Sequence, residues 1–446
     1  LGLWLPTVLH ISIAGAQTTS AKRFTLEDAV RSALRNNHDL ASARHEVGRA
    51  EARLREAWGY AMPSIDLSGK YSRSIKKPVF FFPNIFDSAA SKRGEVTAIE
   101  IGSDNAFDLN LTVSQVLFNS AVFTGVGTAK VYSQAALEVF RAKEVETIAN
   151  ARKAFYGVLL AAEVGEMLRS NLKNAEENFK NASILTEQGL LSEYDKLRAE
   201  VGLANVRPEV IRAESNYELA VNSLKIAMGV PFDQEIEIGG TLGFTPVDDG
   251  ILKHATATVL ENNPSLAALR YQQDVNDAVT AVERSNYLPS LAAFGNYQFQ
   301  TQKNDLRIST RDFVNSSIVG ISLSMNIFNG FRTAARVEQA ELDARKTQEQ
   351  IASMENSLKT AVQSTLMSLK RAKERIEAQQ RTVEQAGKGY RIATTRFTSG
   401  SGTQLEVNDA QLALTTAKTN RIQAIYDYLV ASAELDQLLG HKPEYV

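Results

Sequence analysis

The residue types that carry enzyme chemistry are sparse in this chain. Cysteine is absent, which removes disulfides, thiol nucleophiles, cysteine-zinc sites and an acylated N-terminal cysteine. The histidines lack His-x-x-x-His or similar ligand spacing; they are His10, His38, His45, His254 and His441. No Gly-x-Gly-x-x-Gly before a helix, phosphate loop or Gly-x-Ser-x-Gly occurs. The formal net charge of −2 offers no basic field to nucleic acid. We therefore expect no enzyme, metal site or cofactor.

Acidic residues do recur at two helix starts. Ser192-Glu193-Tyr194-Asp195 and Thr403-Gln404-Leu405-Glu406 both place an acid three residues after a hydroxyl cap. Carboxylates near a helix N-terminus stabilise the helix for that reason alone. Asp409 lies beyond the first turn, so capping does not explain it.

The chain is a tandem duplication of one long unit. Asn-Asn-His-Asp-Leu at residues 36–40 returns as Asn-Asn-Pro-Ser-Leu at 262–266, which is 226 positions later. Phe118-Asn119 returns 210 positions later, and the later matches lie 211 apart: Gly189, Ala199, Tyr217, Leu224 and Gly229 return as Gly400, Ala410, Tyr428, Leu435 and Gly440. The first copy therefore carries about sixteen extra residues between Tyr71 and Phe118. Repeats of this kind dictate the architecture.

Each copy contains two segments whose apolar residues alternate with polar or small ones. This period of two predicts strands with one apolar and one polar face. The apolar positions are Ile65, Leu67, Gly69 and Tyr71; Phe107, Leu109, Leu111 and Val113; Leu291, Ala293, Gly295, Tyr297 and Phe299; and Ile321, Leu323, Met325 and Ile327.

The rest of each copy is predicted to be helical. A capping-box spacing at Thr25 and Asp28 begins a helix that extends to Trp58. A very long helix covers residues 333–397, with a heptad pattern typical of a coiled coil: Val337, Ala344, Ile351 and Leu358, and Ala340, Thr347, Met354 and Ala361. It breaks at Ser399-Gly400-Ser401-Gly402, and a second helix returns over 403–439. The first copy breaks at Gln188-Gly189-Leu190-Leu191 and returns over 192–228.

The domain boundaries follow from the repeat. Residues 1–16 are apolar, too short to span a bilayer, and end in Ala14-Gly15-Ala16, which predicts the remainder of a secretory signal peptide. We expect the first structural repeat over 17–230, a linker over 231–250 and the second repeat over 251–446. No later window holds about 20 consecutive apolar residues. Four amphipathic strands cannot close a barrel in lipid, so several chains must combine them, unless the helices cover a soluble sheet.

The pattern resembles the TolC family of outer-membrane efflux proteins. The resemblance covers Phe24 to Gly440 and depends on three stretches in order: the Phe-Thr-Leu-Glu-Asp-Ala-Val opening with Asn-Asn-His-Asp-Leu, the duplicated Pro-Ser strand starts at 63 and 289, and the segment 396–411 around the second helical turn. The resemblance implies a mostly helical homotrimer. Its twelve-stranded barrel would sit in the outer membrane of a Gram-negative bacterium, and its helices would form a coiled-coil tunnel in the periplasm.

The resemblance also implies a function and partners. The chain would be the passive exit duct of a tripartite efflux or type I secretion system, working with a periplasmic adaptor and an inner-membrane transporter that supplies the energy. The hairpin tips would contact the adaptor; they are Gly189, Leu190, Leu191, Ser192, Gly400, Ser401, Gly402 and Thr403. The drug, metal or protein cargo is not specified by the sequence.

A periplasmic gate is implied as well. Asp409 and Glu406 align with acidic positions that line the family's constriction, and Asp195 repeats the arrangement in the first copy. Arg198 occupies the position equivalent to Asp409, and we hypothesise that it pairs with an acid of a neighbouring hairpin. The alternative is an ordinary solvated charge.

Two questions stay open at this stage. The loop over 73–106 holds the extra residues and includes Phe80-Phe81-Phe82, which would rim or plug the outer mouth or pack within a longer cap. An exported soluble coiled-coil scaffold without a pore explains the heptads and the signal, but not the paired alternating strands or their duplication.

Overall fold

The computed structural model describes residues 22–83 and 96–442. The chain divides into two compact units. The helical unit takes the described parts of residues 1–45, 138–266 and 353–446, and the sheet unit takes those of 46–137 and 267–352. The expected signal segment, residues 1–16, lies outside the described residues. Within those residues, no helix is long and apolar enough to cross a membrane.

The duplication is visible in the element order. The first copy contributes α1 (Leu26–Asn36), α2 (His38–Gly59), β2 (Ser64–Arg73), β5 (Asn105–Phe118), α4 (Ser120–Glu187) and α5 (Glu193–Met228). The second contributes α6 (Asp249–Asn262), α7 (Pro264–Ser285), β7 (Ser290–Lys303), β8 (Val314–Ser324), α8 (Arg332–Thr398) and α9 (Gln404–Leu439). The long helix expected over 333–397 and its return helix are thus correct to within a residue.

Two details of the predicted elements were wrong. The single helix expected up to Trp58 is interrupted at Asn37, whose ψ of 125° is extended, so α1 and α2 are separate helices. The last strand ends at Ser324, so Met325 and Ile327 lie beyond it. In the segment expected to link the copies, β6 (Ile236–Ile238) pairs in parallel with β1 (Lys22–Phe24), and α6 begins at Asp249. The capping box of Thr25 and Asp28 is confirmed.

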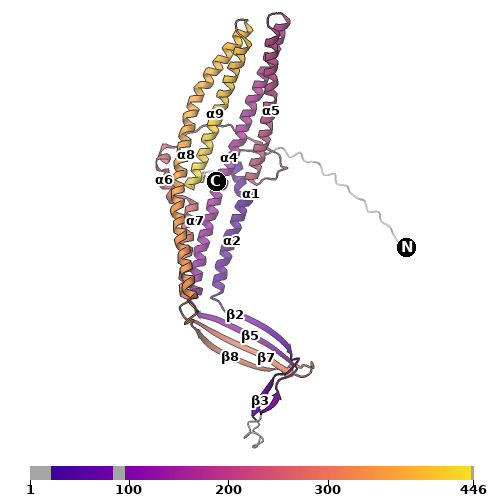
Figure 1. The fold of residues 1–446 in the computed structure, drawn as a ribbon, viewed down its shortest axis with the longest axis vertical. Coiled ribbons are helices and arrows are strands. Elements are labelled where there is room, and N and C mark those ends of the chain that lie inside the picture. The colour runs from indigo at the N-terminus through magenta and orange to yellow at the C-terminus, as the bar shows by residue number, and fades with distance from the viewer. Residues whose placement is uncertain (1–21, 84–95, 443–446) are drawn as a thin grey trace, which may run out of the picture. The chain divides into compact units, whose positions relative to one another are not determined.

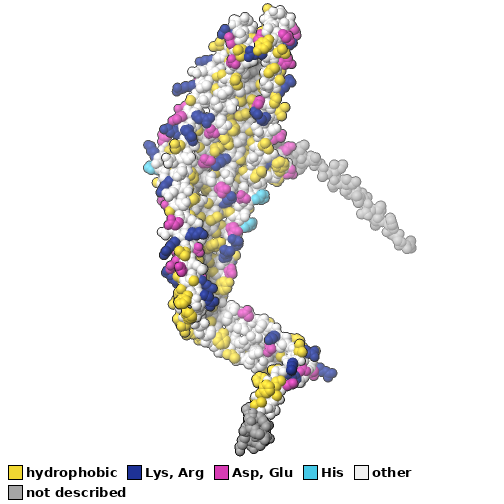
Figure 2. All heavy atoms as spheres, viewed as in Figure 1, with side chains coloured by type: hydrophobic (Ala, Val, Ile, Leu, Met, Phe, Trp, Pro, Cys, Tyr) yellow, Lys and Arg dark blue, Asp and Glu magenta, His cyan; other side chains and the backbone are white. Residues whose placement is uncertain are grey.

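The sheet unit contains a four-stranded antiparallel sheet in the order β2-β5-β7-β8 (Figure 1). The middle pair, β5 with β7, joins the two copies. Register places Ile65, Val113, Gly295 and Val319 in one row, and Ser68, Asn110, Gln298 and Ser316 in another. Because side chains alternate along a strand, the first row belongs to an apolar face and the second to a polar face. Few charged side chains cover the sheet in the view of Figure 2.

The apolar face of this sheet is exposed in the single chain. Leu67 is 68% exposed and Ile321 is 68% exposed, although both are large apolar side chains. Among the described residues, β2 pairs only with β5 and β8 only with β7, so both outer edges of the sheet keep unpaired backbone groups. The extra residues of the first copy form, in their described part, a hairpin of β3 (Val79–Pro83) with β4 (Val96–Glu100). A 3-10 turn (η1, Thr310–Asp312) precedes β8.

The long helix α8 follows the predicted heptads only in part. Ala340, Ala344, Thr347 and Leu358 are buried as expected. Beyond Leu358 the buried positions shift by one residue, from the expected Ala361 to Val362, and continue through Thr365, Leu369, Ala372 and Ile376. A helix with 3.6 residues per turn drifts relative to a strict seven-residue repeat, so a straight helix must occasionally move its buried stripe forward by a residue.

Candidate functional site

The two hairpin turns of the helical unit have the same backbone geometry. Gly189 and Gly400 have φ values of 73° and 74°, in the left-handed region that glycine tolerates best. Leu190 N donates to Leu185 O at 2.9 Å, and Ser401 N donates to Arg396 O at 2.9 Å. Each turn therefore ends its helix with the same glycine-dependent cap, repeated 211 residues later. Both turns lie at the same end of the helical unit (Figure 1).

The turns are held against each other by a small apolar cluster. Ala393, Phe397 and Val407 of the second hairpin are buried together. Leu185 and Leu191 of the first hairpin pack against them. The fold thus brings the two predicted tips of one chain together, while Leu190, Ser192, Ser401 and Thr403 stay exposed.

Arg396 stabilises the second turn. The first turn has no such contact, because Leu185 takes the equivalent position. The Arg396 Nη2 donates to the carbonyl oxygen of Ser401 at 3.1 Å. A Cβ added to Gly402 would lie 2.9 Å from the Cβ of Arg396, so this second glycine is needed for close approach of the chain. The two tips therefore present different surfaces on the same backbone.

Glu406 lies beside Arg396. Its backbone N donates to Thr403 Oγ1 at 3.3 Å, as the capping interpretation expects. Its carboxylate, however, forms an ion pair with Arg396, with 3.5 Å between Oε2 and Nη1. The pair is about half exposed, so its contribution to stability is under about 1 kcal/mol.

The other predicted gate residues lie on α5 and α9. Asp195 accepts a hydrogen bond from Ser192 Oγ at 2.6 Å, so it serves the helix cap. The Arg198 guanidinium lies 5.7 Å from the ring centre of Tyr194. Asp409 is exposed. Neither Arg198 nor Asp409 forms an ion pair with another described residue, so the structure does not bring them together within one chain.

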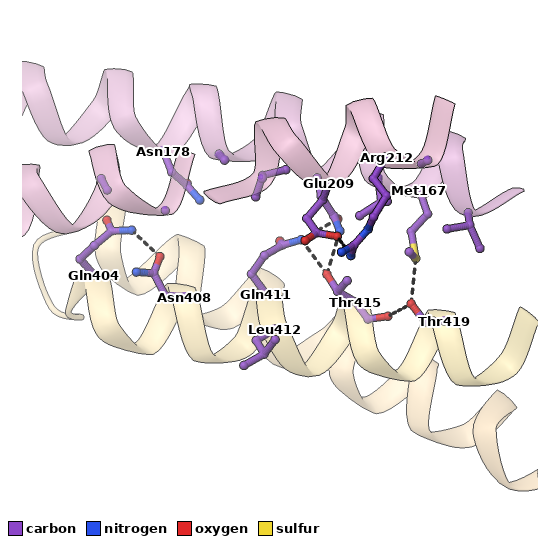
Figure 3. Close-up of a pocket in the computed structure, with 18 of the residues that line it drawn as sticks. Met167, Asn178, Glu209, Arg212, Gln404, Asn408, Gln411, Leu412, Thr415 and Thr419 are labelled. Carbon is purple, nitrogen blue, oxygen red and sulfur yellow. Dashed lines mark hydrogen bonds and ion pairs between the residues drawn. The ribbon is translucent and has the colours of Figure 1, made fainter. Parts of the chain in front are cut away.

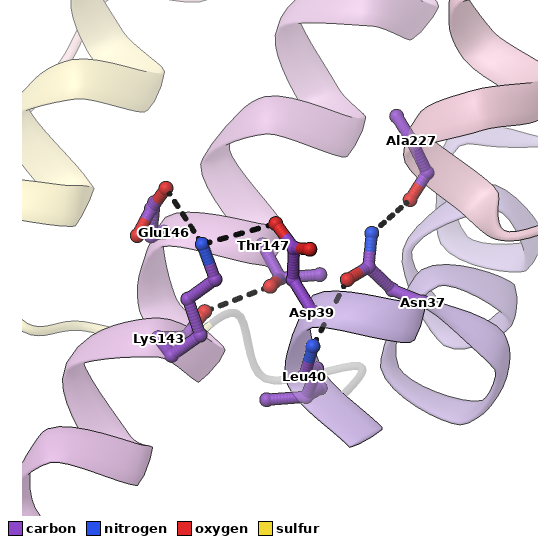
Figure 4. Close-up of polar contacts among 7 residues, drawn as sticks. All are labelled: Asn37, Asp39, Leu40, Lys143, Glu146, Thr147 and Ala227. Carbon is purple, nitrogen blue, oxygen red and sulfur yellow. Dashed lines mark hydrogen bonds and ion pairs between the residues drawn. The ribbon is translucent and has the colours of Figure 1, made fainter. Parts of the chain in front are cut away.

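The repeated asparagines, noted in the sequence only as a marker of duplication, have a defined structural role (Figure 4). Asn37 Oδ1 accepts from the backbone N of Leu40 at 3.1 Å and so begins α2. Its Nδ2 donates to the carbonyl oxygen of Ala227, near the end of α5, at 3.2 Å. One side chain therefore caps one helix and binds the C-terminal end of another.

The second copy repeats these contacts. Asn263 Oδ1 accepts from Leu266 N at 3.0 Å, and its Nδ2 donates to Leu438 O at 3.0 Å. The glycines that end α5 and α9 pack tightly here: a Cβ on Gly229 would lie 2.2 Å from Asn36 O, and one on Gly440 would lie 2.8 Å from Asn262 O. We call the Asn37 and Asn263 contacts the two asparagine clamps. Their recurrence at equivalent positions was the sequence signal that could have revealed them.

The first clamp has an ionic group beside it. Lys143 Nζ lies 3.3 Å from Asp39 Oδ2 and 3.2 Å from Glu146 Oε1 (Figure 4). Partial burial opposes the charge of Lys143, but its hydrogen bonds to Glu146 and Asp39 outweigh this and raise its pKa. In the second copy Met354 and Ser265 take the places of Lys143 and Asp39. A further ion pair joins Arg152 to Asp436 at 2.5 Å.

Family comparison decides the identity of this architecture. The model of the outer membrane efflux protein family matches residues 29–230 and 256–441. This chain belongs to that family. Its two matched segments correspond to the two copies, and the resemblance to the TolC family is confirmed. The chain is an outer-membrane efflux channel.

Individual relatives support the same family assignment. The alkaline protease secretion protein AprF of Pseudomonas aeruginosa is 24% identical over 73% of this chain and 68% of its own length. The cobalt-zinc-cadmium resistance protein CzcC of Cupriavidus metallidurans is 24% identical over 94% and 91%. The outer membrane protein TolC of Vibrio cholerae is 23% identical over 74% and 76%. None of these comparisons supports a soluble scaffold.

The fold agrees with a solved channel. The outer membrane channel CmeC of Campylobacter jejuni superposes with a TM-score of 0.77 over 99% of this chain and 94% of its own, at 18% identity. The mostly helical duplicated fold with a small sheet is therefore that of an outer-membrane channel.

Proposed function

We propose that three copies of this efflux channel form one twelve-stranded barrel in the outer membrane, continued by a periplasmic tunnel of helices. The four-stranded sheet carries the proposal. Its apolar face is exposed, and both of its edges are unpaired among the described residues. Lipid excludes unpaired backbone edges, and closure with neighbouring copies removes them.

A second observation supports self-association through the helices. An apolar stripe on α5 is exposed along about eight turns; it consists of Leu197, Val201, Pro208, Ile211, Leu219 and Ile226. At 100° per residue these positions fall within about 80° of one another. Burial of each large aliphatic side chain would contribute about 1.5–3 kcal/mol.

The duplication indicates what covers this α5 stripe. Five of the six equivalent positions on α9, all except Leu412, are buried or half-buried. There α9 packs on α4 of the same chain, with Thr419 Oγ1 3.6 Å from Met167 Sδ. In the duplication α5 corresponds to α9, and α8 corresponds to α4. The α5 stripe therefore packs on α8 of a second copy. Three chains related in this way close a ring of six hairpins.

The partners follow from the position of the tips. The exposed turn residues around Gly189 and Gly400 contact a periplasmic adaptor, which links the duct to an inner-membrane transporter. The transporter supplies the energy and selects the cargo. AprF and CzcC are named for protease secretion and for metal resistance, so the family resemblance leaves the cargo class open.

The gate proposal concerns Asp409, Glu406, Asp195 and Arg198. Threefold symmetry turns each exposed charge into a ring, which favours cations and narrows the periplasmic entrance. Asp409 and Arg198 have no ionic partner among the described residues of their own chain, which supports a partner on a neighbouring hairpin. The Phe80–Phe82 segment lies on β3, where its exposed rings support a place at the outer mouth.

Fractionation and conductance test this function. A heat-modifiable trimer in outer-membrane extracts, with single-channel conductance in planar bilayers, is the expected result. Recovery of a monomer in the soluble periplasm would contradict the proposal and favour the scaffold. A membrane-bound trimer without conductance would contradict the duct while leaving the assembly intact.

A further inference from the structure

A cleft of about 610 Å³ opens between the first hairpin and α9, entirely within the helical unit (Figure 3). Its walls come from α4, α5 and α9 of one chain, so it is complete without a second copy. Its size falls in the range that holds a drug-sized molecule. No role in the efflux function described above uses it.

The lining of the cleft combines aliphatic side chains with carboxamides and carries no net charge. Val164, Leu168 and Val206 contribute aliphatic surface, and carboxamides such as Asn178 and Asn408 lie between them. The charged side chains among the lining residues, Glu209 and Arg212, are bonded to each other. An ion therefore finds no uncompensated counter-charge here, whereas a neutral amphipathic molecule matches the wall.

Two carboxamide oxygens of the wall lack a hydrogen-bond donor among the described residues. Gln404 is 1% exposed; its Nε2 donates to Asn408 Oδ1 at 2.9 Å, but its Oε1 is unpaired. Gln411 Nε2 donates to Asn171 Oδ1 at 2.8 Å, and its Oε1 is also unpaired. A buried acceptor without a donor is costly and rare in proteins.

The equivalent positions of the first copy carry charged side chains. Gln404 and Gln411 occupy the positions that Glu193 and Glu200 occupy in the first copy. Glu193 and Glu200 are exposed on α5. The second copy therefore keeps the acceptor oxygens and removes the charge where the side chains enter the cleft wall, as burial requires.

We propose that this cleft is a binding site for a neutral molecule with an apolar body and at least one N–H donor. The terminal torsion of a glutamine is broad, so the Gln404 carboxamide can turn its oxygen toward an incoming N–H. The aliphatic wall receives the apolar body. An ester of the same shape lacks the donor and leaves the acceptor unpaired.

The test compares benzanilide with phenyl benzoate, its ester isostere, binding to the full chain in detergent-free amphipol. We expect benzanilide to bind at least tenfold more tightly, as measured by ligand-detected NMR titration. Gln404→Leu should remove about tenfold of that preference, since one hydrogen bond is lost. Glu193→Gln, at the equivalent exposed position, should change nothing.

A cavity-filling variant keeps the test decisive even if Gln404→Leu does not fold. A Cβ on Gly202, in the cleft wall, meets no heavy atom within 4 Å, so Gly202→Phe fills the space from the opposite side. It should abolish binding of both probes. Equal affinity for the amide and the ester, binding that survives Gly202→Phe, or a co-crystal with ordered water only in the cleft would overturn the proposal.

Discussion

Asn37 and Asn263 stand 226 residues apart and make the same two hydrogen bonds, one to the start of the following helix and one to the C-terminal end of a hairpin helix. Each asparagine clamp therefore fixes where a long hairpin ends relative to the helix pair beside it. The duplicated motif therefore anchors both hairpins in the same way.

The asparagine clamps should be measurable one at a time. Asn37→Ala removes a helix cap and a half-buried hydrogen bond, so we expect a loss of about 1–3 kcal/mol in local stability. Hydrogen exchange at the amide of Leu40 would report it. Asn37→Asp keeps the helix cap and loses the hydrogen bond to Ala227. Its local stability should therefore lie between those of the parent chain and Asn37→Ala. Asn36→Ala, next to it, should be nearly neutral; an equal effect there would refute the assignment.

The tip glycines should resist substitution. Gly400→Ala places a Cβ on a residue with φ of 74° and should cost about 1 kcal/mol. Gly389→Ala is the matched control, because its helical position on α8 has no heavy atom within 4 Å of a new Cβ and should gain up to about 1 kcal/mol. Thermal unfolding of the two variants should shift in opposite directions. Shifts of the same sign would argue against a strained turn.

The gate assignment predicts a change in conductance. Arg198→Ala or Asp409→Ala removes a ring of charge. The periplasmic entrance should then widen, and single-channel conductance in planar bilayers should rise. Glu200→Ala, an exposed acid on α5 outside the proposed gate, should leave conductance unchanged. If neither gate variant differs from the parent chain, these residues are not the gate.

The α5 stripe predicts where copies meet. Ile211→Asp places a charge in a seam that assembly should bury, so the trimer should weaken by several kcal/mol and appear as monomer on native gels. Asn205→Asp adds a charge to an exposed α5 position outside the stripe and should assemble normally. Normal assembly of the Ile211 variant would show that this face stays open.

The ionic group beside the first asparagine clamp predicts an alkaline sensitivity. The pKa of Lys143 is raised above its ordinary value of 10.5 in the folded chain, so its stabilising contribution is complete below that pH. The contribution is lost as the pH rises through the folded value. Lys143→Met, the residue found in the second copy, should reduce this alkaline loss in denaturant titrations. Lys173→Met, on an exposed part of α4, should retain it.

Much of the fold was predictable because it depends on local patterns. The bounds of α8 and α9 follow from an uninterrupted helical composition between glycine turns, and the faces of β2, β5, β7 and β8 follow from the period of two. The break at Asn37 depends on two bonds: a local cap on Leu40, and a bond to Ala227, which lies 190 positions away. The second bond is why the break was missed. No local propensity encodes such a contact.

The candidate site was less predictable for a related reason. The helix cap at Thr403 was predicted from residue spacing. The Glu406 carboxylate, however, pairs with Arg396 and does not complete a capping box. This pairing depends on the close approach of the chain at Gly402 to Arg396. We propose that the ionic partners of Arg198 and Asp409 lie on another copy, and a pattern within one chain does not specify such a partner. The β3–β4 hairpin was missed because its apolar residues, Phe80–Phe82 among them, are consecutive and show no alternation.

The contrast between α5 and α9 also bears on how the proposed ring would avoid incorrect assembly. The α9 face that meets α4 carries amides and hydroxyls, and Asn171 of α4 donates to Thr415 there at 2.9 Å. The equivalent α5 face is aliphatic. If a hairpin docked at the wrong seam, Asn171 would be buried against Leu197 or Ile211 with no acceptor, at a cost of about 1–3 kcal/mol per unpaired group. In the proposed trimer, polarity would distinguish the seam that forms during folding of one chain from the seam that forms between chains.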